Sequence, residues 1–312
     1  MRILVLGAGG TGGYYGGRLQ QAGAGVVFLT RPATTARLRR EGLRIRSRFG
    51  DALLPATAGD GTGEEFAGPF DLVILGCKSF DLAPALDAIR PFTGPATPVL
   101  PLLNGLVHLD RLDALFGRDN VLGGLSYIGS TVAPDGEIIH LNHLDTLIFG
   151  PRGETHHALC RNVLTLWQAA GTEAILSPRI EQEMWEKFVY LSTLSGMTCL
   201  MRAPIGAILE ADDGESLLCE MLAECESVAQ ASGAPVRPEA RERALGILTT
   251  RGSRFTASML RDLEAGNRIE ADHIVGDMLR RARVLGLPTP LLRTAYAHLQ
   301  ARDARRALDA LA

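Results

Sequence analysis

The sequence is poor in aromatic residues and has no concentration of charge of one sign. Phe, Trp and Tyr make up 5% of its 312 residues, which argues against a stacking platform for single-stranded nucleic acid. The net charge is −3 and no run of Lys or Arg stands out, so electrostatics supports neither a nucleic acid nor an anionic membrane as a partner. No apolar run approaches the roughly 20 residues that would span a bilayer. We therefore expect no nucleic-acid partner and no membrane association.

Cysteine is also scarce, with five scattered residues and no C-x-x-C pair. Buried, reduced thiols in a cytoplasmic protein are the simplest interpretation of this pattern. The apolar stretch at residues 3–6 is too short for a signal peptide and leads directly into glycines, which indicates a buried strand. The histidines belong to no H-E-x-x-H motif or Cys/His cluster. We therefore predict no metal site and a cytoplasmic location.

What the chain does have is enough apolar sequence for about two folded domains. Hydrophobic residues make up 46% and charged residues 21%, which are ordinary globular values. Apolar runs at residues 2–6, 26–29, 72–75 and 99–103 alternate with turns and helical segments. Runs that are apolar on both faces are typical of a parallel sheet covered by helices. The first part of the chain is therefore predicted to be an α/β domain with a Rossmann-type, doubly wound sheet.

The pattern changes between residues 121 and 150. Strand-like runs at residues 126–133 and 137–140 flank a Pro-Asp-Gly turn, and residues 146–149 are predicted to form a further strand. These runs predict an antiparallel extension of the sheet. A helix at residues 156–170 and a last short strand at residues 173–176 are expected to follow.

The strand signal disappears after residue 177, and helical apolar spacing takes over. The predicted helices cover residues 180–200, 216–232, 238–248, 258–285 and 290–312. Their composition, rich in Ala, Glu, Arg and Leu, supports the helical prediction. We therefore predict a Rossmann domain at residues 1–177 and an all-helical C-terminal domain at residues 178–312.

A glycine-rich turn joins the first predicted strand to the first predicted helix. The spacing G-x-G-x-x-G permits a tight turn, a close approach of the backbone to a pyrophosphate, and close packing of the helix on the strand. The start of the helix adds free N–H groups and a positive dipole end. Because the pattern stands at the first strand-to-helix turn, it predicts a dinucleotide site rather than a merely structural turn. The cofactor-binding residues would be Gly7, Ala8, Gly9, Gly10, Thr11 and Gly12.

The end of the second predicted strand indicates which dinucleotide binds. NAD-binding proteins usually place an acidic residue there, to accept a hydrogen bond from the ribose 2′-hydroxyl. Here the strand ends in Thr30-Arg31-Pro32, without Asp or Glu. A guanidinium matches the geometry of a phosphate and stays charged at any working pH. We therefore predict that Arg31 binds the 2′-phosphate of NADP(H). The plainer alternative is that Arg31 is a solvated surface arginine.

Polar residues also follow two other strands and stand on the predicted helices. Lys78 and Asn104 come just after strands, at the edge where open α/β sheets bind ligands. Lys187 precedes an unusually apolar run on a long helix, and Ser258 and Glu270 lie on a later helical stretch. Taken singly, each has a plainer interpretation, as a turn residue, a snorkelling lysine or a solvated helix face.

The order of the motifs is more specific than any one of them. The chain carries, in sequence, G-A-G-x-x-G from Gly7, then Arg31, Cys77-Lys78, Asn104-Gly105, Trp185-x-Lys187, Ser258-Met259-Leu260-x-Asp262 and Glu270-x-Asp272-x-Ile274-x-Gly276. This series resembles the 2-dehydropantoate 2-reductase (ketopantoate reductase) family over nearly the whole chain. The resemblance implies an NADPH-dependent reductase with a Rossmann domain and a helical domain.

The same resemblance implies roles for individual residues. Lys187 matches the family's catalytic lysine, and Glu270 matches a glutamate that binds a substrate hydroxyl and serves catalysis. Asn104 matches an asparagine shared by cofactor and substrate. Lys78 matches a lysine near the cofactor, and Ser258 a serine near the substrate carboxylate. Burial of Lys187 beside its apolar neighbours would lower its pKa.

The chain departs from the family where asparagines usually stand four and eight residues after the lysine. Those positions hold Leu191 and Ser195, so one hydrogen-bond donor is lost and Ser195 is a shorter substrate contact. Each missing hydrogen bond to a charged substrate costs about 1.5–3 kcal/mol. The predicted pocket is therefore more apolar than the family pattern, which leaves the identity of the 2-oxo acid open.

The predicted function is NADPH-dependent reduction of a branched 2-oxo acid, with 2-dehydropantoate, an intermediate of pantothenate biosynthesis, as the first candidate. Two alternatives stay open. One is a reductase of a different oxo acid or an imine on the same scaffold, and the other is an NADP(H)-sensing protein without turnover. The sequence also leaves open whether the chain forms a homodimer.

One geometric prediction concerns the stretch 258–285. In a straight helix, Ser258 and Glu270 would lie roughly 18 Å apart along the axis, too far for one small oxo acid to touch both. Gly266 can end a helix in the left-handed conformation, and Asn267 can begin the next one. We therefore predict an interruption at residues 265–268, with Glu270 in the first turn of a second helix.

Overall fold

The computed structural model describes residues 1–309, and contacts within the chain divide it into two compact units. The N-terminal unit comprises Met1–Leu103 and His108–Glu181. The C-terminal unit comprises Asn104–Val107 and the chain from Gln182 onward. The short segment Asn104–Val107 therefore belongs with the helices, although only two residues separate it from a strand of the first unit.

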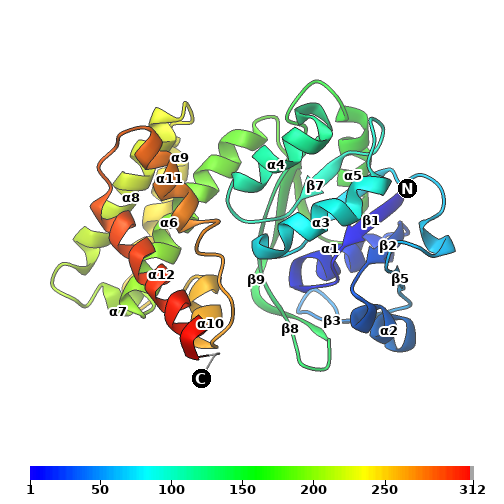
Figure 1. The fold of residues 1–312 in the computed structure, drawn as a ribbon, viewed down its shortest axis with the longest axis horizontal. Helices are drawn as coiled ribbons and strands as arrows, with labels where there is room; N and C mark the ends of the chain where they lie inside the picture. Colours follow the sequence, from blue (N-terminus) through cyan, green and yellow to red (C-terminus); the bar gives the residue numbers. More distant parts are fainter. Residues whose placement is uncertain (310–312) are drawn as a thin grey trace. The chain divides into compact units, whose positions relative to one another are not determined.

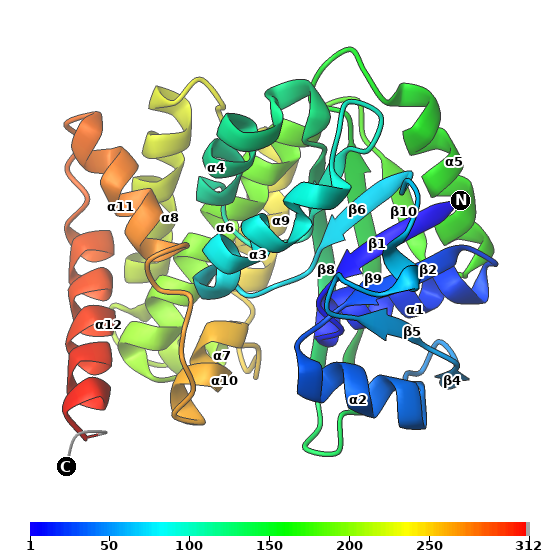
Figure 2. The ribbon, with the colours of Figure 1, turned by 45° about the vertical axis from the view of Figure 1, so that its right-hand side comes forward.

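A five-stranded parallel sheet forms the base of the N-terminal unit. Its strand order is β5-β2-β1-β6-β7, and Figure 2 shows β6, β1, β2 and β5 side by side. β1 pairs with β2 on one side and with β6 on the other, both in parallel. The strands are β1 (Arg2–Leu6), β2 (Gly25–Leu29), β5 (Thr57–Gly59), β6 (Leu72–Leu75) and β7 (Val99–Pro101). The predicted Rossmann-type sheet is thus confirmed.

A second, mixed sheet of five strands carries the predicted antiparallel pair. β8 and β9 form a long hairpin, as the sequence predicts, but β9 is one continuous strand and residues 146–149 are its final part. The hairpin does not extend the parallel sheet strand by strand, because β9 also pairs in parallel with β3 and β10. The strands are β3 (Leu43–Arg46), β4 (Ala52–Leu54), β8 (Gly123–Val132), β9 (Ile138–Gly150) and β10 (Glu173–Leu176).

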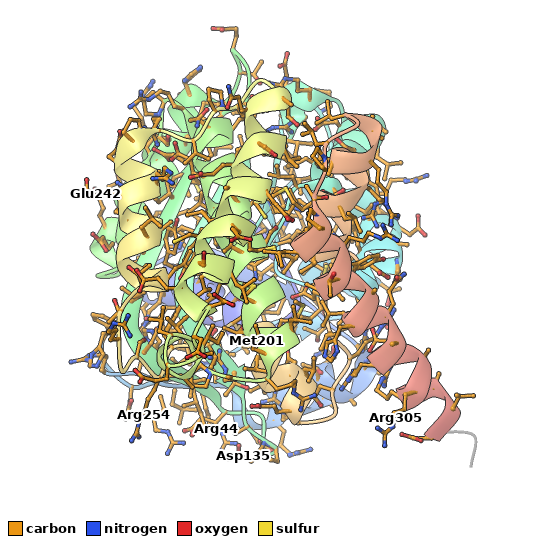
Figure 3. The ribbon with its side chains drawn as sticks, turned by 90° about the vertical axis from the view of Figure 1, so that its left-hand side faces the viewer. Arg44, Asp135, Met201, Glu242, Arg254 and Arg305 are labelled. Carbon is orange, nitrogen blue, oxygen red and sulfur yellow. The ribbon has the colours of Figure 1, made fainter. Side chains whose placement is uncertain are left out.

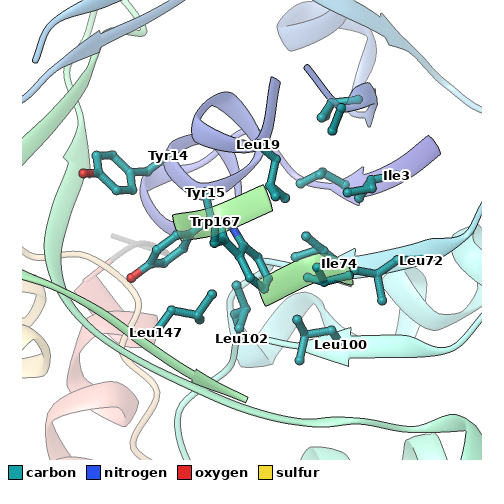
Figure 4. Packing of buried hydrophobic residues seen from close by; sticks show 14 of the residues in the cluster. Ile3, Tyr14, Tyr15, Leu19, Leu72, Ile74, Leu100, Leu102, Leu147 and Trp167 are labelled. Atoms are coloured by element: carbon teal, nitrogen blue, oxygen red, sulfur yellow. The ribbon is translucent and has the colours of Figure 1, made fainter. Parts of the chain in front are cut away.

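The main core of this unit surrounds helix α1. α1 contacts β1 and β2 of the parallel sheet and β8 and β9 of the mixed sheet, so it lies between the two. Figure 4 shows Tyr15 of α1 beside Trp167 of α5, and both are fully buried, as is Tyr14. The helices of the unit are α1 (Gly10–Gln21), α2 (Pro32–Glu41), α3 (Leu82–Ile89), α4 (Val107–Phe116) and α5 (His157–Ala169), with short 3-10 turns at Glu64–Phe66, Ser79–Asp81, Arg90–Phe92 and Arg118–Asn120.

The described part of the C-terminal unit is helical, as predicted (Figure 1). Charged side chains such as Glu242 on α9 and Arg305 on α12 stand on its surface (Figure 3). The helices are α6 (Ile180–Met201), α7 (Ile205–Ile208), α8 (Gly214–Ala231), α9 (Pro238–Leu248), α10 (Ser258–Glu264), α11 (Val275–Val284) and α12 (Pro290–Asp309). The last three residues of the helix predicted at 290–312 lie outside the described residues.

The predicted interruption after Ser258 is confirmed, but it is longer than predicted. α10 ends at Glu264, and Gly266 adopts a φ of 73°. The N–H of Asn267 donates to the carbonyl of Asp262 and that of Gly266 to Leu263, which is the closure expected of a glycine-terminated helix. Two details were wrong: Asn267 begins no helix, and Glu270 precedes α11 instead of standing in its first turn. Ile269, within the intervening segment, is buried.

Candidate active site

The glycine loop lies between β1 and α1, where the sequence predicts it. Gly7 has a φ of 90°, and Gly9 is the residue before the first helical turn of α1. That first turn contains no acidic residue, and an α-helix leaves its first N–H groups without partners inside the helix. No described heavy atom lies within 4 Å of a Cβ placed on Gly9. The loop therefore fits an anionic pyrophosphate in both space and charge.

Close packing around Gly12 fixes the loop, and it involves a residue that the motif does not include. A Cβ on Gly12 would lie 2.5 Å from the carbonyl oxygen of Gly7, and one on Gly76 would lie 2.7 Å from Cα of Gly12. Gly76 follows β6 directly, so the start of α1 sits against the end of that strand. A glycine immediately after an apolar strand was the available signal, and the sequence reasoning did not use it.

Arg31 follows β2 at the same edge of the parallel sheet and precedes Pro32, the first residue of α2. Its Nη2 donates to Oδ2 of Asp81 at 2.8 Å, and the Arg31 side chain is 77% exposed. Lys78 is exposed and lies just after β6. The sheet topology thus brings the glycine loop, Arg31 and Lys78 to one edge, because β2 and β6 flank β1.

Lys187 is a buried residue of α6, with 6% of its surface exposed. The interpretation as a snorkelling surface lysine is therefore wrong. Burial lowers the pKa of Lys187 from 10.5 to about 7. On the preceding residue, burial alone would raise the pKa of Glu186, but hydrogen bonds from Arg237 and Gln182 bring it below the usual value. Glu186 is thus tied to Arg237, whose Nε lies 2.6 Å away.

The loop that carries Asn104 packs against the turn that carries Glu270. Gly105 has a φ of 82°, and a Cβ on it would lie 2.7 Å from the carbonyl oxygen of His273. The carbonyl of Glu270 accepts hydrogen bonds from the N–H groups of His273 and Ile274. Two predicted site residues that are far apart in sequence are therefore brought together within one unit.

The other residues of the last motif hold this turn in place. The Tyr296 hydroxyl of α12 donates to Oδ1 of Asp272, and Arg280 donates to the Asp272 carbonyl at 2.7 Å. A Cβ on Gly276 would lie 2.6 Å from the Tyr296 ring. Asp272 and Gly276 thus anchor the turn to α12 and α11, so Glu270 stands on a fixed segment.

The remaining candidates lie on two helices. Leu191 and Ser195 follow Lys187 at the four-residue spacing that places side chains on one helix face. Ser195 is 2% exposed, and Leu191 is partly buried. Ser258 is the exposed first residue of α10, on a different element from Lys187 and Glu270. The roles of these three residues stay predictions.

Within residues 1–309, the helices are too short or too polar to cross a membrane. Among the same residues, no three His, Cys, Asp or Glu side chains gather in a way that could hold a metal ion.

Comparisons with known proteins agree with the fold and the motifs. Residues 3–154 match the family model described as ketopantoate reductase PanE/ApbA, and residues 179–303 match that of its C-terminal domain. The uncharacterized oxidoreductase YkpB of Bacillus subtilis (strain 168) is 33% identical over 307 residues, which cover 98% of this chain and 100% of that protein. The 2-dehydropantoate 2-reductase of Halobacterium salinarum is 29% identical over 297 residues, which cover 94% of this chain and 96% of that protein.

A solved structure shows the same fold. A PanE/ApbA family ketopantoate reductase from Ralstonia eutropha JMP134 superposes with a TM-score of 0.87 and 27% identity, over 98% of this chain and 100% of that chain. Two family models thus cover most of the sequence, and relatives match it almost end to end. The chain is an oxidoreductase that acts on CH–OH groups with NADP(H), and it belongs to the ketopantoate reductase family.

Proposed function

We propose that the chain reduces the C2 carbonyl of a branched 2-oxo acid, and that 2-dehydropantoate, reduced to pantoate, is its substrate. The similarity to proteins named 2-dehydropantoate 2-reductase supports this substrate and, with it, a step in pantothenate biosynthesis. The observation that carries the proposal is the burial of Lys187 on α6. The cytoplasmic location and the homodimer remain predictions.

Lys187 is suited to act as the proton donor. Reduction of a carbonyl develops negative charge on oxygen, which a nearby ammonium stabilises and then protonates. An ordinary lysine holds its proton too tightly at neutral pH, whereas a pKa of about 7 allows both protonation states. Lys78 and Lys187 are the only lysines in the sequence, which otherwise uses arginine as its cationic residue. Arginine cannot release a proton under these conditions, so lysine at position 187 supports a role in proton transfer.

Asn104 and Glu270 would orient the substrate. The Asn104 amide can donate to the carbonyl oxygen, and the Glu270 carboxylate can accept a hydrogen bond from a substrate hydroxyl. Because Gly105 packs on His273, the Asn104 loop and the Glu270 turn form one rigid support. Ser195 and Ser258 complete the proposed substrate contacts.

The cofactor would be held by the glycine loop at its pyrophosphate and by Arg31 at its 2′-phosphate, with Lys78 nearby. Bound NADPH supplies the hydride. Arg31 is exposed and carries a fork of N–H donors that fits a phosphate.

A reductase of another 2-oxo acid is the second candidate, and Leu191 favours it. Leu191 lies one helical turn from Lys187 and is partly buried, so it offers apolar contact where the family's asparagine would offer the substrate a hydrogen bond. An imine substrate would use the same lysine.

The test is the initial rate of NADPH oxidation with 2-dehydropantoate, with 2-oxo acids of the same branching that lack its hydroxyl, and with cyclic imines. We expect the highest kcat/KM for 2-dehydropantoate and its loss in Lys187→Ala. A higher kcat/KM for a hydroxyl-free acid or an imine would show that 2-dehydropantoate is not the substrate. No turnover with any of these compounds would support an NADP(H)-sensing protein.

A further inference from the structure

Arg31 and Asp81 follow two different strands, which flank β1, the strand that leads into the glycine loop. Arg31 lies two residues after the end of β2, and Asp81 lies six residues after the end of β6. β2 and β6 both pair with β1. In such sheets the adenosine half of a dinucleotide binds at the carboxyl ends of these strands, beside the residue that reads its ribose. The ion pair between Arg31 and Asp81 therefore stands where the 2′-position is recognised.

The Asp81 carboxylate faces Arg31 instead of serving its own helix. Asp81 is the N-cap residue of α3, a position where aspartate usually accepts hydrogen bonds from the helix N–H groups. It makes no such capping bond here, and its Oδ2 lies 2.8 Å from Nη2 of Arg31. The Asp81 side chain is 35% exposed, so it remains accessible to a ligand. The carboxylate is thus available to the cofactor edge.

The two forms of the cofactor differ in what they offer to this pair. The 2′-phosphate of NADPH carries a charge between about −1.5 and −2 and can take both donors of the guanidinium fork. An exposed ion pair is weak enough to yield to it. The displaced carboxylate would then stay close to the phosphate and repel it. NADH offers a 2′-hydroxyl instead. The Asp81 carboxylate can accept a hydrogen bond from this hydroxyl while Arg31 stays paired with Asp81.

We propose that Asp81 is a specificity-determining residue that limits the preference of this enzyme for NADPH over NADH. Asp81 weakens the binding of NADPH by repelling its 2′-phosphate, and it favours the binding of NADH by accepting a hydrogen bond from the ribose 2′-hydroxyl. The pair thus reads both cofactors, with Arg31 for the phosphate and Asp81 for the hydroxyl. The inference rests on the role proposed for Arg31, but not on the identity of the substrate.

The test uses two probes that differ only in the 2′-phosphate, adenosine 2′,5′-bisphosphate and AMP, titrated against the full-length protein by calorimetry. Asp81→Asn should tighten the binding of the bisphosphate about 3- to 10-fold and weaken the binding of AMP. Asp87→Asn is the matched control, because Asp87 lies on the same helix, is 77% exposed and pairs with Arg90 at 3.7 Å. It should change neither affinity. The gain in Asp81→Asn should also shrink at high salt.

Arg31→Ala separates this inference from the role of Arg31. If Arg31→Ala abolishes the preference for the bisphosphate while Asp81→Asn leaves the ratio of the two affinities unchanged, the role of Asp81 is wrong and that of Arg31 stands. If Arg31→Ala keeps the preference, both roles are wrong. Neither outcome depends on which oxo acid is reduced, since the probes report binding alone.

Discussion

Replacing Lys187 by methionine should make the protein more stable and catalytically inactive at the same time. Lys187 is 6% exposed, and burial lowers its pKa from 10.5 to about 7. A shift of that size corresponds to about 5 kcal/mol of destabilisation while the folded protein keeps this lysine protonated. Methionine has a similar length and no charge, so Lys187→Met should recover most of that free energy at neutral pH. Such an opposition between stability and activity is common at functional sites.

The pH dependence of the effect follows from the same shift. Because the pKa of Lys187 is lower in the folded than in the unfolded chain, the unfolded chain binds more protons between pH 7 and pH 10.5. The stability of the wild type should therefore rise with pH in that window. The destabilisation is complete below pH 7 and disappears toward pH 10.5. The advantage of Lys187→Met should shrink by about 3 kcal/mol between pH 7 and pH 9.5.

Urea unfolding of the full-length proteins at the two pH values measures this difference. Lys78→Met is the matched control, because Lys78 is exposed and its replacement should give no pH-dependent gain. An advantage of Lys187→Met that stays constant with pH, or a loss of stability at pH 7, would show that Lys187 is not held with a depressed pKa.

Three further predictions concern the cofactor, the pocket and the loop. Arg31→Ala should raise KM for NADPH at least about tenfold and change KM for NADH little, as steady-state kinetics with both cofactors will show; equal losses would remove Arg31 from its role. Leu191→Asn should raise kcat/KM for 2-dehydropantoate about tenfold if a hydrogen bond is missing there, whereas a decrease would mean that the pocket is adapted in another way. Gly105→Ala should cost about 1–3 kcal/mol in urea unfolding and lower kcat, because its φ is 82° and its Cβ would meet the His273 carbonyl at 2.7 Å. Gly246→Ala, with no described atom within 4 Å, is its control and should do neither.

The pattern of apolar residues along the chain predicted the strands that are continuous apolar runs. It missed the strands whose burial depends on partners distant in the sequence. Four strands of the parallel sheet, β1, β2, β6 and β7, were predicted because they are continuous apolar runs, and Leu72–Leu75 of β6 are all buried. β3, β4 and β5 were not predicted, since each has only three or four residues, and β3 also includes the polar Arg44. The polar residues near the middle of β9, among them His140 and Asn142, hid its continuity, because this part of the hairpin is largely exposed.

The candidate site divides in the same way. The glycine loop and the break at Gly266 follow from local backbone chemistry, and both were predicted. The length of the break, from Glu264 to Val275, was not predicted, and the support of Asn104 depends on packing of Gly105 against His273. The partner of Arg31, Asp81, comes from another strand. Such long-range contacts leave no signal in a single sequence, so spacing alone could not reveal them.

The most direct test of the proposed reaction follows the hydride itself. NADPH carrying two deuterium atoms at C4, so that either face delivers label, would be incubated with 2-dehydropantoate and the full-length protein, and the acid product analysed by mass spectrometry. We predict pantoate with one deuterium at C2 from the wild type and none from Lys187→Met, although the variant should still bind NADPH. Unlabelled product, or labelled product formed equally well by Lys187→Met, would contradict reduction of this oxo acid with Lys187 as the proton donor.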